Sequence, residues 1–353
     1  MSRATTPSLV PSAWASLMCT HHRENSIFQR GDGHSEGETA LPYGLIREHF
    51  RAAGIELNTP DLNLGRPVLF ELHVNARRQS PKSRAYVYLF ENPLIRPLNR
   101  NHAALARYAR WFTWDQTLLT DPRASSLLYP ACGPVVSRAG PESRDLFLVH
   151  VASNKALLTV DPRDQYQVRA LIIRWYEENA PMDFHLYGRG WEYPAALSGG
   201  WGRVCHQWRK TLGKFCAPVS PYRTWRGTIE NKMMLLGRAR FCIAHENCRD
   251  LAGYVTEKLF DCFRTGCVPI YVGPKEIHDL IPAACFIDGR QFANPAAMDA
   301  YLRGVNNEQY RGYQQAAQAF MQSAAAKLFR PADFATRLTD EILKDLAVAG
   351  LFR

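Results

Sequence analysis

The chain has 353 residues, of which 46% are hydrophobic and 22% charged, and its formal net charge is +10 at pH 7. This composition is typical of a globular protein large enough for two domains, and no segment approaches the roughly 20 uncharged apolar residues of a membrane span. The positive charge favours anionic partners, but the Lys and Arg residues are scattered and form no basic run interleaved with aromatic residues. We therefore expect no nucleic acid as a partner.

The nine cysteines form no Cys-x-x-Cys pair and no array with histidines at zinc-site spacing. Free thiols in a reducing compartment are the simplest interpretation. Residues 1–25 contain one early Arg and no clear apolar core of a signal peptide. These features predict a cytoplasmic protein, free or peripheral at the inner face of the membrane.

Strands and helices are expected to alternate through residues 1–121, which predicts an α/β domain with a parallel sheet. The predicted strands are 12–19, 68–74, 85–90 and 111–114, and the predicted helices are 39–53 and 101–110. The Gly-rich segment 31–37 precedes the first helix, but it lacks the strand context and the Lys-Ser/Thr ending of a phosphate loop. It is interpreted as a mobile loop.

Residues 122–144 are rich in Pro and Gly without a sustained period, so they are interpreted as a linker between two domains. A second α/β domain is predicted over 145–330. Its predicted strands are 146–152 and 183–187, its helices are 165–178, 229–238, 295–303 and 307–325, and the strand–helix–strand unit described below completes it.

A last helix is predicted over 331–347, with one apolar face and one charged face. Its apolar residues are Phe334, Leu338, Ile342 and Leu346. Such a helix either packs on its own protein, here on the first domain, or attaches weakly to a membrane surface. Both interpretations stay open at this point.

The segment 240–274 is the most informative part of the chain. Short apolar runs at 241–244 and 267–272 predict two strands, and an apolar stripe over 254–265 predicts a helix between them that ends at Gly266. In such a unit the loop after the first strand is where open parallel sheets bind ligands. Here that loop is the polar sequence His-Glu-Asn-Cys-Arg-Asp, at 245–250.

The first helical turn of this unit carries Glu257 and Lys258. A helix N-terminus presents free N–H groups and partial positive charge, so a cation there costs roughly 0.3–1 kcal/mol unless an anion lies beside it. A bound phosphate would be such an anion, and the neighbouring carboxylate could accept the hydroxyls of a ribose. The pair therefore indicates a nucleotide site, with an exposed ion-pairing turn as the alternative.

The segments 245–247, 254–259 and 266–274 closely resemble the donor-binding core of the family 10 α1,3/α1,4-fucosyltransferases. That family has Glu-Asn, then Tyr-(Val/Ile)-Thr-Glu-Lys, then a strand with Val-Pro that ends in Gly. The resemblance extends more thinly upstream and covers about residues 91–287. His245 departs from the usual Phe at its place, which affects the packing of the guanine or sugar pocket.

The resemblance implies a GT-B architecture, in which two Rossmann-like domains face a cleft, here with a helical C-terminal tail. It implies an inverting, bacterial-type enzyme that moves L-fucose from GDP-β-L-fucose to a hydroxyl of a glycan, of N-acetyllactosamine type or in lipopolysaccharide. No cofactor or metal is expected, because the chain has no Asp-x-Asp to bridge a metal to a diphosphate. Matching positions give the donor-binding candidates: Arg169, Asn247, Tyr254, Glu257 and Lys258, with Ser153, Asn154, Gly188 and Glu246 as secondary candidates.

Glu91 is the catalytic candidate. It directly follows the predicted strand 85–90 and matches the Glu-Asn that carries the proposed base of the family. A Glu that merely leaves a strand is the alternative, and Glu71 and His73 are the next residues to consider. At the level of function, a GDP-sugar-binding protein without catalysis and a glycosyltransferase with another donor sugar both stay open, whereas a dinucleotide oxidoreductase would need a G-x-G-x-x-G turn that is missing after the strands.

Overall fold

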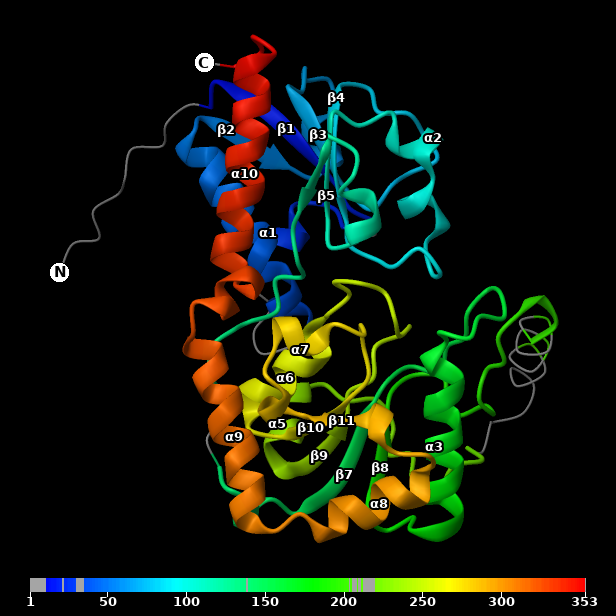
Figure 1. Cartoon of the computed structure of the whole chain (residues 1–353). Coiled ribbons are helices and arrows are strands. Elements are labelled where there is room, and N and C mark those ends of the chain that lie inside the picture. Colours follow the sequence, from blue (N-terminus) through cyan, green and yellow to red (C-terminus); the bar gives the residue numbers. More distant parts are fainter. Residues whose placement is uncertain are drawn as a thin grey trace. The chain divides into compact units, whose positions relative to one another are not determined.

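The computed structural model describes residues 11–20, 22–29, 35–137, 139–202, 204, 208, 211 and 220–352. The chain divides into two compact units. Unit 1 contains Met1–Asp32, Glu36–Leu127 and Pro331–Arg353, and unit 2 contains Gly33–Ser35 and Leu128–Arg330. Each unit is built on one parallel sheet (Figure 1). Within the described residues no helix is long and apolar enough to cross a membrane.

The sheet of unit 2 has the order β11-β10-β9-β7-β8, with every neighbouring pair parallel. The strands are β7 (Leu146–Val151), β8 (Phe184–Tyr187), β9 (Ala239–Ile243), β10 (Val268–Tyr271) and β11 (Ile287–Asp288). One face is covered by α3 (Gln165–Asn179) and α8 (Pro295–Gly304), whose apolar side chains pack with those of β7, β8 and β9. Because parallel strands share one direction, the loops after β7, β9 and β10 meet at the same edge.

The other elements of unit 2 are α5 (Lys232–Arg238), α6 (Glu257–Thr265), α7 (Ile277–Leu280) and α9 (Asn307–Gln322). The predicted C-cap of α6 is confirmed, because Gly266 has a left-handed φ of 68°. The helix begins three residues later than expected. It is buried on nearly all sides, and its buried Asp261 is compensated by an ion pair with Lys232 at 2.7 Å.

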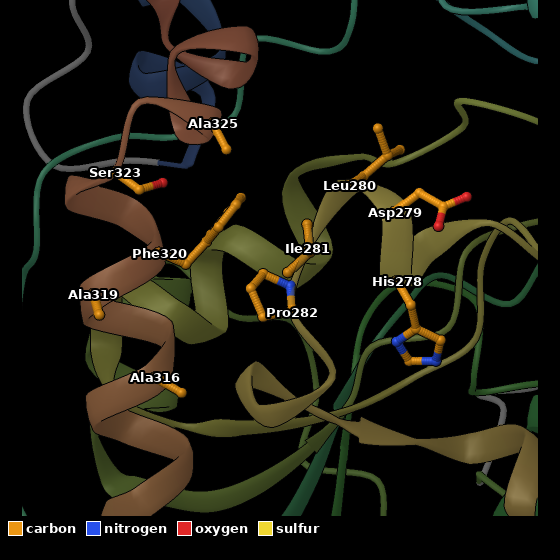
Figure 2. A pocket seen from close by; sticks show the side chains of 10 residues that line it. All are labelled: His278, Asp279, Leu280, Ile281, Pro282, Ala316, Ala319, Phe320, Ser323 and Ala325. Atoms are coloured by element: carbon orange, nitrogen blue, oxygen red, sulfur yellow. The ribbon is translucent and has the colours of Figure 1, made fainter.

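An apolar groove of about 530 Å³ lies in unit 2 between α9 and the segment 278–282 (Figure 2). Ile281, Pro282 and Phe320 form much of its wall. None of the residues predicted to bind the donor lines this groove.

The sheet of unit 1 has the order β2-β1-β3-β4-β5-β6 and is parallel throughout. The strands are β1 (Ala13–Met18), β2 (Ile55–Asn58), β3 (Phe70–Val74), β4 (Arg84–Leu89), β5 (Arg110–Thr113) and β6 (Ala124–Ser126), and the first helices are α1 (Ser35–Ala52) and α2 (His102–Leu105). The predicted parallel α/β organisation is thus present in both halves of the chain.

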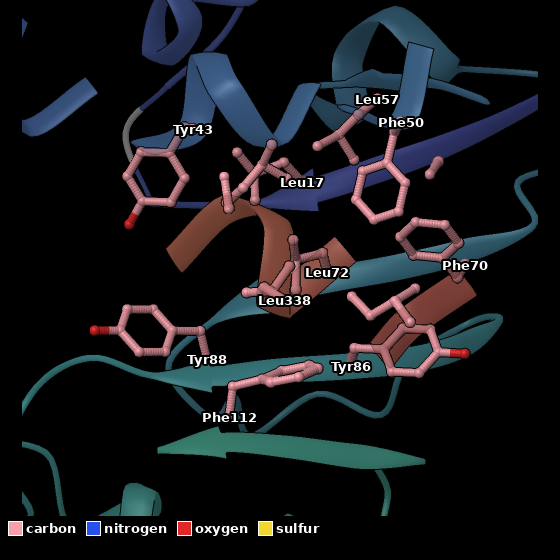
Figure 3. Close-up of a cluster of buried hydrophobic side chains, with 14 of the residues drawn as sticks. Leu17, Tyr43, Phe50, Leu57, Phe70, Leu72, Tyr86, Tyr88, Phe112 and Leu338 are labelled. Carbon is pink, nitrogen blue, oxygen red and sulfur yellow. The ribbon is translucent and has the colours of Figure 1, made fainter. Parts of the chain in front are cut away.

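The last helix, α10 (Pro331–Val348), packs in the core of unit 1. All four residues of its predicted apolar face are buried, and Figure 3 shows Leu338 among the side chains of β3, β4 and β5. Asp345 anchors the helix, because it accepts a hydrogen bond from Tyr86 at 2.6 Å and pairs with Arg84 at 2.7 Å. The apolar face is therefore occupied within the fold and is not left for a membrane surface.

Several expectations differ from the structure. The range 122–144 is not a free linker, because β6 completes the sheet of unit 1 and the residues after Leu127 pack in unit 2. In particular, Arg144 is buried and donates to the main-chain oxygens of Leu236, Ala239 and Thr265. The helix expected over 101–110 is one turn long, and β2 was not foreseen. Of the segment 31–37, residues 31–34 lie outside the described part, and 35–37 begin α1.

Candidate functional site

The polar segment after β9 continues the pairing of the sheet. The N–H of Ala244 donates to the oxygen of Ile270 at 2.9 Å, and that of Glu246 donates to the oxygen of Val272 at 2.8 Å. Side chains alternate along a strand, so Glu246 and His245 point to opposite faces of the sheet. The loop predicted to bind the ligand is therefore held as an extension of the sheet edge.

Glu246 is the centre of a buried network. Its side chain has no exposed area, and its carboxylate accepts from the N–H of Thr256 at 2.8 Å and from Tyr271 Oη at 3.1 Å. Thr256 Oγ1 donates to the same carboxylate at 2.8 Å, and Lys258 Nζ does so at 3.0 Å. Because Thr256 is the N-cap residue of α6, this network fixes the start of that helix.

The anion beside Lys258 is therefore a carboxylate of the chain itself. The sequence suggested a bound phosphate in this role, and the structure corrects this inference, because Glu246 already compensates the charge. Lys258 Nζ donates to Glu246 and Thr256, and its third hydrogen has no partner among the described residues. Burial would raise the pKa of the neighbouring Glu257, but Lys258 and Lys232 lower it overall, so Glu257 is ionised.

Arg169 is a buried cation without a carboxylate partner among the described residues. It lies on the second turn of α3 and is 3% exposed. Its Nε donates to the main-chain oxygen of Gln165 at 3.1 Å, its Nη2 donates to Asn247 Oδ1 at 3.2 Å, and its guanidinium lies 4.6 Å from the ring centre of Tyr166. Burial of an uncompensated charge is costly, and burial lowers the pKa of Arg169. This arrangement is typical of a site that receives an anion.

Asn247 ties Arg169 to the loop after β9. Its side chain accepts from Arg169, and its main-chain oxygen accepts from the N–H of Gln165 at 3.1 Å. Tyr254, in the loop before α6, is 3% exposed, and its N–H donates to the oxygen of Leu251 at 3.0 Å. The main donor-binding candidates of the sequence thus all lie in unit 2, on the loops and helix starts at the carboxyl edge of its sheet.

Two of the secondary candidates, Asn154 and Gly188, stabilise the main chain of the loops after β7 and β8. Asn154 is 7% exposed; its amide group donates to three main-chain oxygens of the segment 190–194, and its Oδ1 accepts from the N–H of Ala196. Gly188 has a φ of 137°, and a Cβ there would lie 2.0 Å from the oxygen of Ala152. Ser153, between these loops, is partly exposed. Asn154 and Gly188 therefore shape the edge of the sheet.

Glu91 lies in unit 1, immediately after Phe90 and β4, and is partly exposed. Its Oε1 accepts from the N–H of Asn92 at 2.9 Å. Its main chain is held on both sides, because its N–H donates to Asn75 Oδ1 at 2.7 Å and its oxygen accepts from Asn99 Nδ2 at 2.6 Å. These asparagines were not foreseen from the sequence, although Asn75 has a left-handed φ of 65° that Asn tolerates better than most residues.

The other base candidates of unit 1 form a closed network. Glu71 Oε2 lies 2.7 Å from His73 Nε2, and the other carboxylate oxygen accepts from the N–H of Lys82 at 3.0 Å. His73 Nδ1 lies 3.0 Å from Tyr108 Oη. Burial lowers the pKa of His73 despite the neighbouring carboxylate, and Glu71 and His73 are 5% and 1% exposed. Glu91 is more accessible than either.

Residues 210–332 match the family model described as glycosyltransferase family 10 (fucosyltransferase), C-terminal. The match covers about a third of the chain, and nearly all of it lies in unit 2. This match confirms the resemblance seen in the sequence. Within the described residues, no group of three or more His, Cys, Asp or Glu side chains is arranged to hold a metal ion.

Curated relatives agree over short stretches. The chain is 36% identical over 69 residues to an α-(1,4)-fucosyltransferase of Arabidopsis thaliana, which covers 20% of this chain and 17% of that protein. It is 33% identical over 88 residues to the 4-galactosyl-N-acetylglucosaminide 3-α-L-fucosyltransferase 9 of Mus musculus, which covers 24% of each. The chain therefore matches about a sixth to a quarter of the length of these relatives.

Solved structures show a similar fold over the whole chain. A DNA-modifying β-glucosyltransferase (TM-score 0.53, 8% identity) aligns over 93% of this chain and 99% of its own. A sucrose-phosphate synthase of Thermosynechococcus elongatus (TM-score 0.53, 10% identity) aligns over 96% of this chain and 100% of its own. An α1,3-fucosyltransferase (TM-score 0.50, 12% identity) aligns over 97% of this chain and 93% of its own. At these identities the likeness concerns the fold, and it confirms the predicted GT-B class.

Replacing Glu246 with Gln should destabilise unit 2. The amide keeps the shape but removes the charge that compensates Lys258, so we expect the free energy of unfolding to fall by about 3 kcal/mol. Urea denaturation of the full chain measures this change. Asp145→Asn is the matched control, because Asp145 and Arg238 form an exposed ion pair in the same unit, for which a change below about 1 kcal/mol is expected. Equal small changes for both variants would contradict the central role of Glu246.

Proposed function

We propose that the protein is an inverting fucosyltransferase, which transfers L-fucose from GDP-β-L-fucose to a hydroxyl of a glycan acceptor in an α1,3 linkage. The observation that carries the proposal is Arg169, a buried guanidinium without a carboxylate partner among the described residues, within a unit that carries a family 10 domain. The diphosphate of the donor supplies the anion that Arg169 lacks.

Unit 2 has further groups suited to a nucleotide diphosphate. Lys258 has one unused Nζ hydrogen, and the first turn of α6 offers main-chain N–H groups. The ionised carboxylate of Glu257 is suited to accept hydrogen bonds from the ribose hydroxyls. Asn247 and Tyr254 lie in the segment between β9 and α6, before Glu257. In this assignment Arg169 and Lys258 neutralise the charge that develops on the departing GDP.

The acceptor is proposed to be a glycan of N-acetyllactosamine type or a lipopolysaccharide chain. Support comes from the mouse relative, whose name describes a 4-galactosyl-N-acetylglucosaminide as the substrate. We also propose a cytoplasmic location, because the described residues contain no disulfide, which suits a reducing compartment. A GDP-sugar-binding protein without turnover, or an enzyme for another sugar, is the alternative, and assays of turnover with several GDP-sugars separate these.

GDP should bind, and more tightly than UDP. Replacing Arg169 with Met keeps much of the side-chain volume and removes the charge, so GDP affinity should fall by about 1.5–3 kcal/mol, as expected when a hydrogen bond to a charged group is lost. Isothermal titration calorimetry measures both. Arg174→Ala, on the exposed side of the same helix, is the control and should bind GDP as the wild type does. Equal affinity for GDP and UDP would rule out the donor assignment.

We propose that transfer needs no metal ion. The positive charge for the diphosphate comes from Arg169, Lys258 and the N-terminus of α6, and the sequence has no Asp-x-Asp. The transfer rate should therefore be the same with EDTA as with added Mg²⁺ or Mn²⁺. Loss of turnover with EDTA that is restored by either ion would show that the built-in cations are insufficient.

We propose Glu91 as the general base that takes the proton of the acceptor hydroxyl during direct displacement. Glu91→Gln keeps the shape and the main-chain contacts but removes basicity, so kcat should fall by roughly 10²–10⁴ while the Kd of GDP stays unchanged. Steady-state kinetics and calorimetry on the same preparation test this separation. Near-normal kcat in Glu91→Gln would move the search to Glu71 and His73.

A further inference from the structure

Two buried histidines lie side by side at the ligand edge of unit 2. His150 belongs to β7, and His245 lies two residues beyond the end of β9; they are 2% and 3% exposed. Leu148 pairs with Phe241 in the parallel register, so alternation places both histidines on the face that α3 covers. Arg169 approaches the sheet from that same face.

Three ring nitrogens of this pair have no hydrogen-bond partner among the described residues: both nitrogens of His245 and Nε2 of His150. The Nδ1 of His150 lies 3.0 Å from the oxygen of Ile243, so it carries the proton and donates to that carbonyl. In the neutral ring, Nε2 of His150 is then an acceptor. Buried polar groups are rarely left unpaired, and such a cluster indicates a polar occupant.

The surroundings keep both rings neutral. Burial, followed by the nearby Arg169 and Arg290, lowers the pKa of His245 to about 3. Burial and Arg169 likewise hold the pKa of His150 well below its usual value. Arg290 pairs with Asp250 at 2.8 Å and donates to the oxygen of Gly273, which fixes it at the same edge.

The hydrogen-bonding capacity of the pair selects the chemistry of the occupant. A neutral His245 offers one donor and one acceptor, and His150 offers an acceptor. A phosphate oxygen can only accept and an ammonium group can only donate, so neither satisfies the set. A hydroxyl group accepts hydrogen bonds and donates its one hydrogen, so it can pair with the donor nitrogen of His245 and with the acceptor nitrogen of His150.

We propose that His245, together with His150, binds a hydroxyl group of the nucleotide sugar. This inference rests on the proposed function and adds a contact to the donor site. The related family usually has Phe in place of His245, and a phenyl ring cannot make this contact. Nε2 of His245 also lies close to the turn after β11, since a Cβ on Gly289 would be 3.1 Å from it, so a larger residue there would crowd the ring.

The hydroxyl belongs either to the ribose or to the transferred sugar, and three ligands separate these sources. Calorimetry with GDP-fucose, GDP and 2′,3′-dideoxy-GDP is performed on the wild type and on His245→Phe. Because the partner of a buried polar group is lost, we expect about tenfold weaker binding of every ligand that carries the contacted hydroxyl. If the contacted hydroxyl belongs to the ribose, His245→Phe should bind GDP and GDP-fucose more weakly but dideoxy-GDP as the wild type does. If it belongs to the transferred sugar, only the binding of GDP-fucose should be weaker.

His185→Phe is the matched control. His185 lies on the neighbouring strand β8, is only partly buried, and its Nδ1 accepts from Arg226 Nε at 3.2 Å. This variant should bind all three ligands as the wild type does. The thermal midpoint of His245→Phe should be unchanged or raised, because the substitution removes two unpaired buried nitrogens.

The remaining outcomes overturn the inference. Unchanged affinity of His245→Phe for all three ligands means that a bound water alone occupies the histidine pair. An equal loss for all three ligands means a packing defect. Should His245→Phe fail to fold, ¹⁵N spectra of histidine-labelled wild type decide, since a ligand hydroxyl must shift the ring nitrogens of His245 and unshifted signals refute the contact. Failure of the wild type to bind GDP would instead refute the proposed function.

Discussion

The interactions of the Glu246 carboxylate hold together the carboxyl edge of the unit 2 sheet. It is fully buried, and it accepts hydrogen bonds from the loop before α6, from α6 itself and from β10. A buried charge is tolerated only when it is paired and fully hydrogen-bonded, and this one has both a cation and neutral donors. The end of β9, the start of α6 and strand β10 are therefore held together at the carboxyl edge of the sheet, where we propose that the donor binds.

The two cations of this edge differ in how the fold compensates them. Lys258 has its counter-charge within the chain, so its position is fixed before any ligand arrives. Within the described part of the chain, the partners of Arg169 are neutral: a carbonyl, an amide and an aromatic ring. Among the described residues, Arg169 has no carboxylate with which a bound anion would compete, whereas Lys258 has one. We therefore propose that Arg169 contributes more than Lys258 to anion binding, a difference that the Glu-Lys sequence pattern alone does not reveal.

The sequence predicted well whatever depends on local patterns. The parallel strands, the ending of α6 at Gly266 and the apolar face of α10 all follow from the periodicity of apolar residues and from a C-cap glycine. It predicted poorly what depends on contacts between distant residues. Residues 122–144 look like a linker because they are rich in Pro and Gly, yet Arg144 is fixed by carbonyl groups more than 90 residues away. Likewise, the anion beside Lys258 was predicted to be a ligand phosphate, whereas it is the carboxylate of Glu246, 12 residues away.

The same limit applies to the catalytic candidate, Glu91. The way its main chain is held can be compared with the network around Glu246 in unit 2. Glu91 was identified because it follows a strand. Asn75 and Asn99, which hold its main chain, were not identified, because these contacts join distant residues and follow no local sequence pattern. In unit 1 neutral amides hold the loop, whereas in unit 2 a buried carboxylate does so. The main chain is thus held by uncharged side chains in unit 1 and by an ionic network in unit 2. The ionic network also fixes Lys258, whose ammonium group is one of the cations that we propose for the diphosphate.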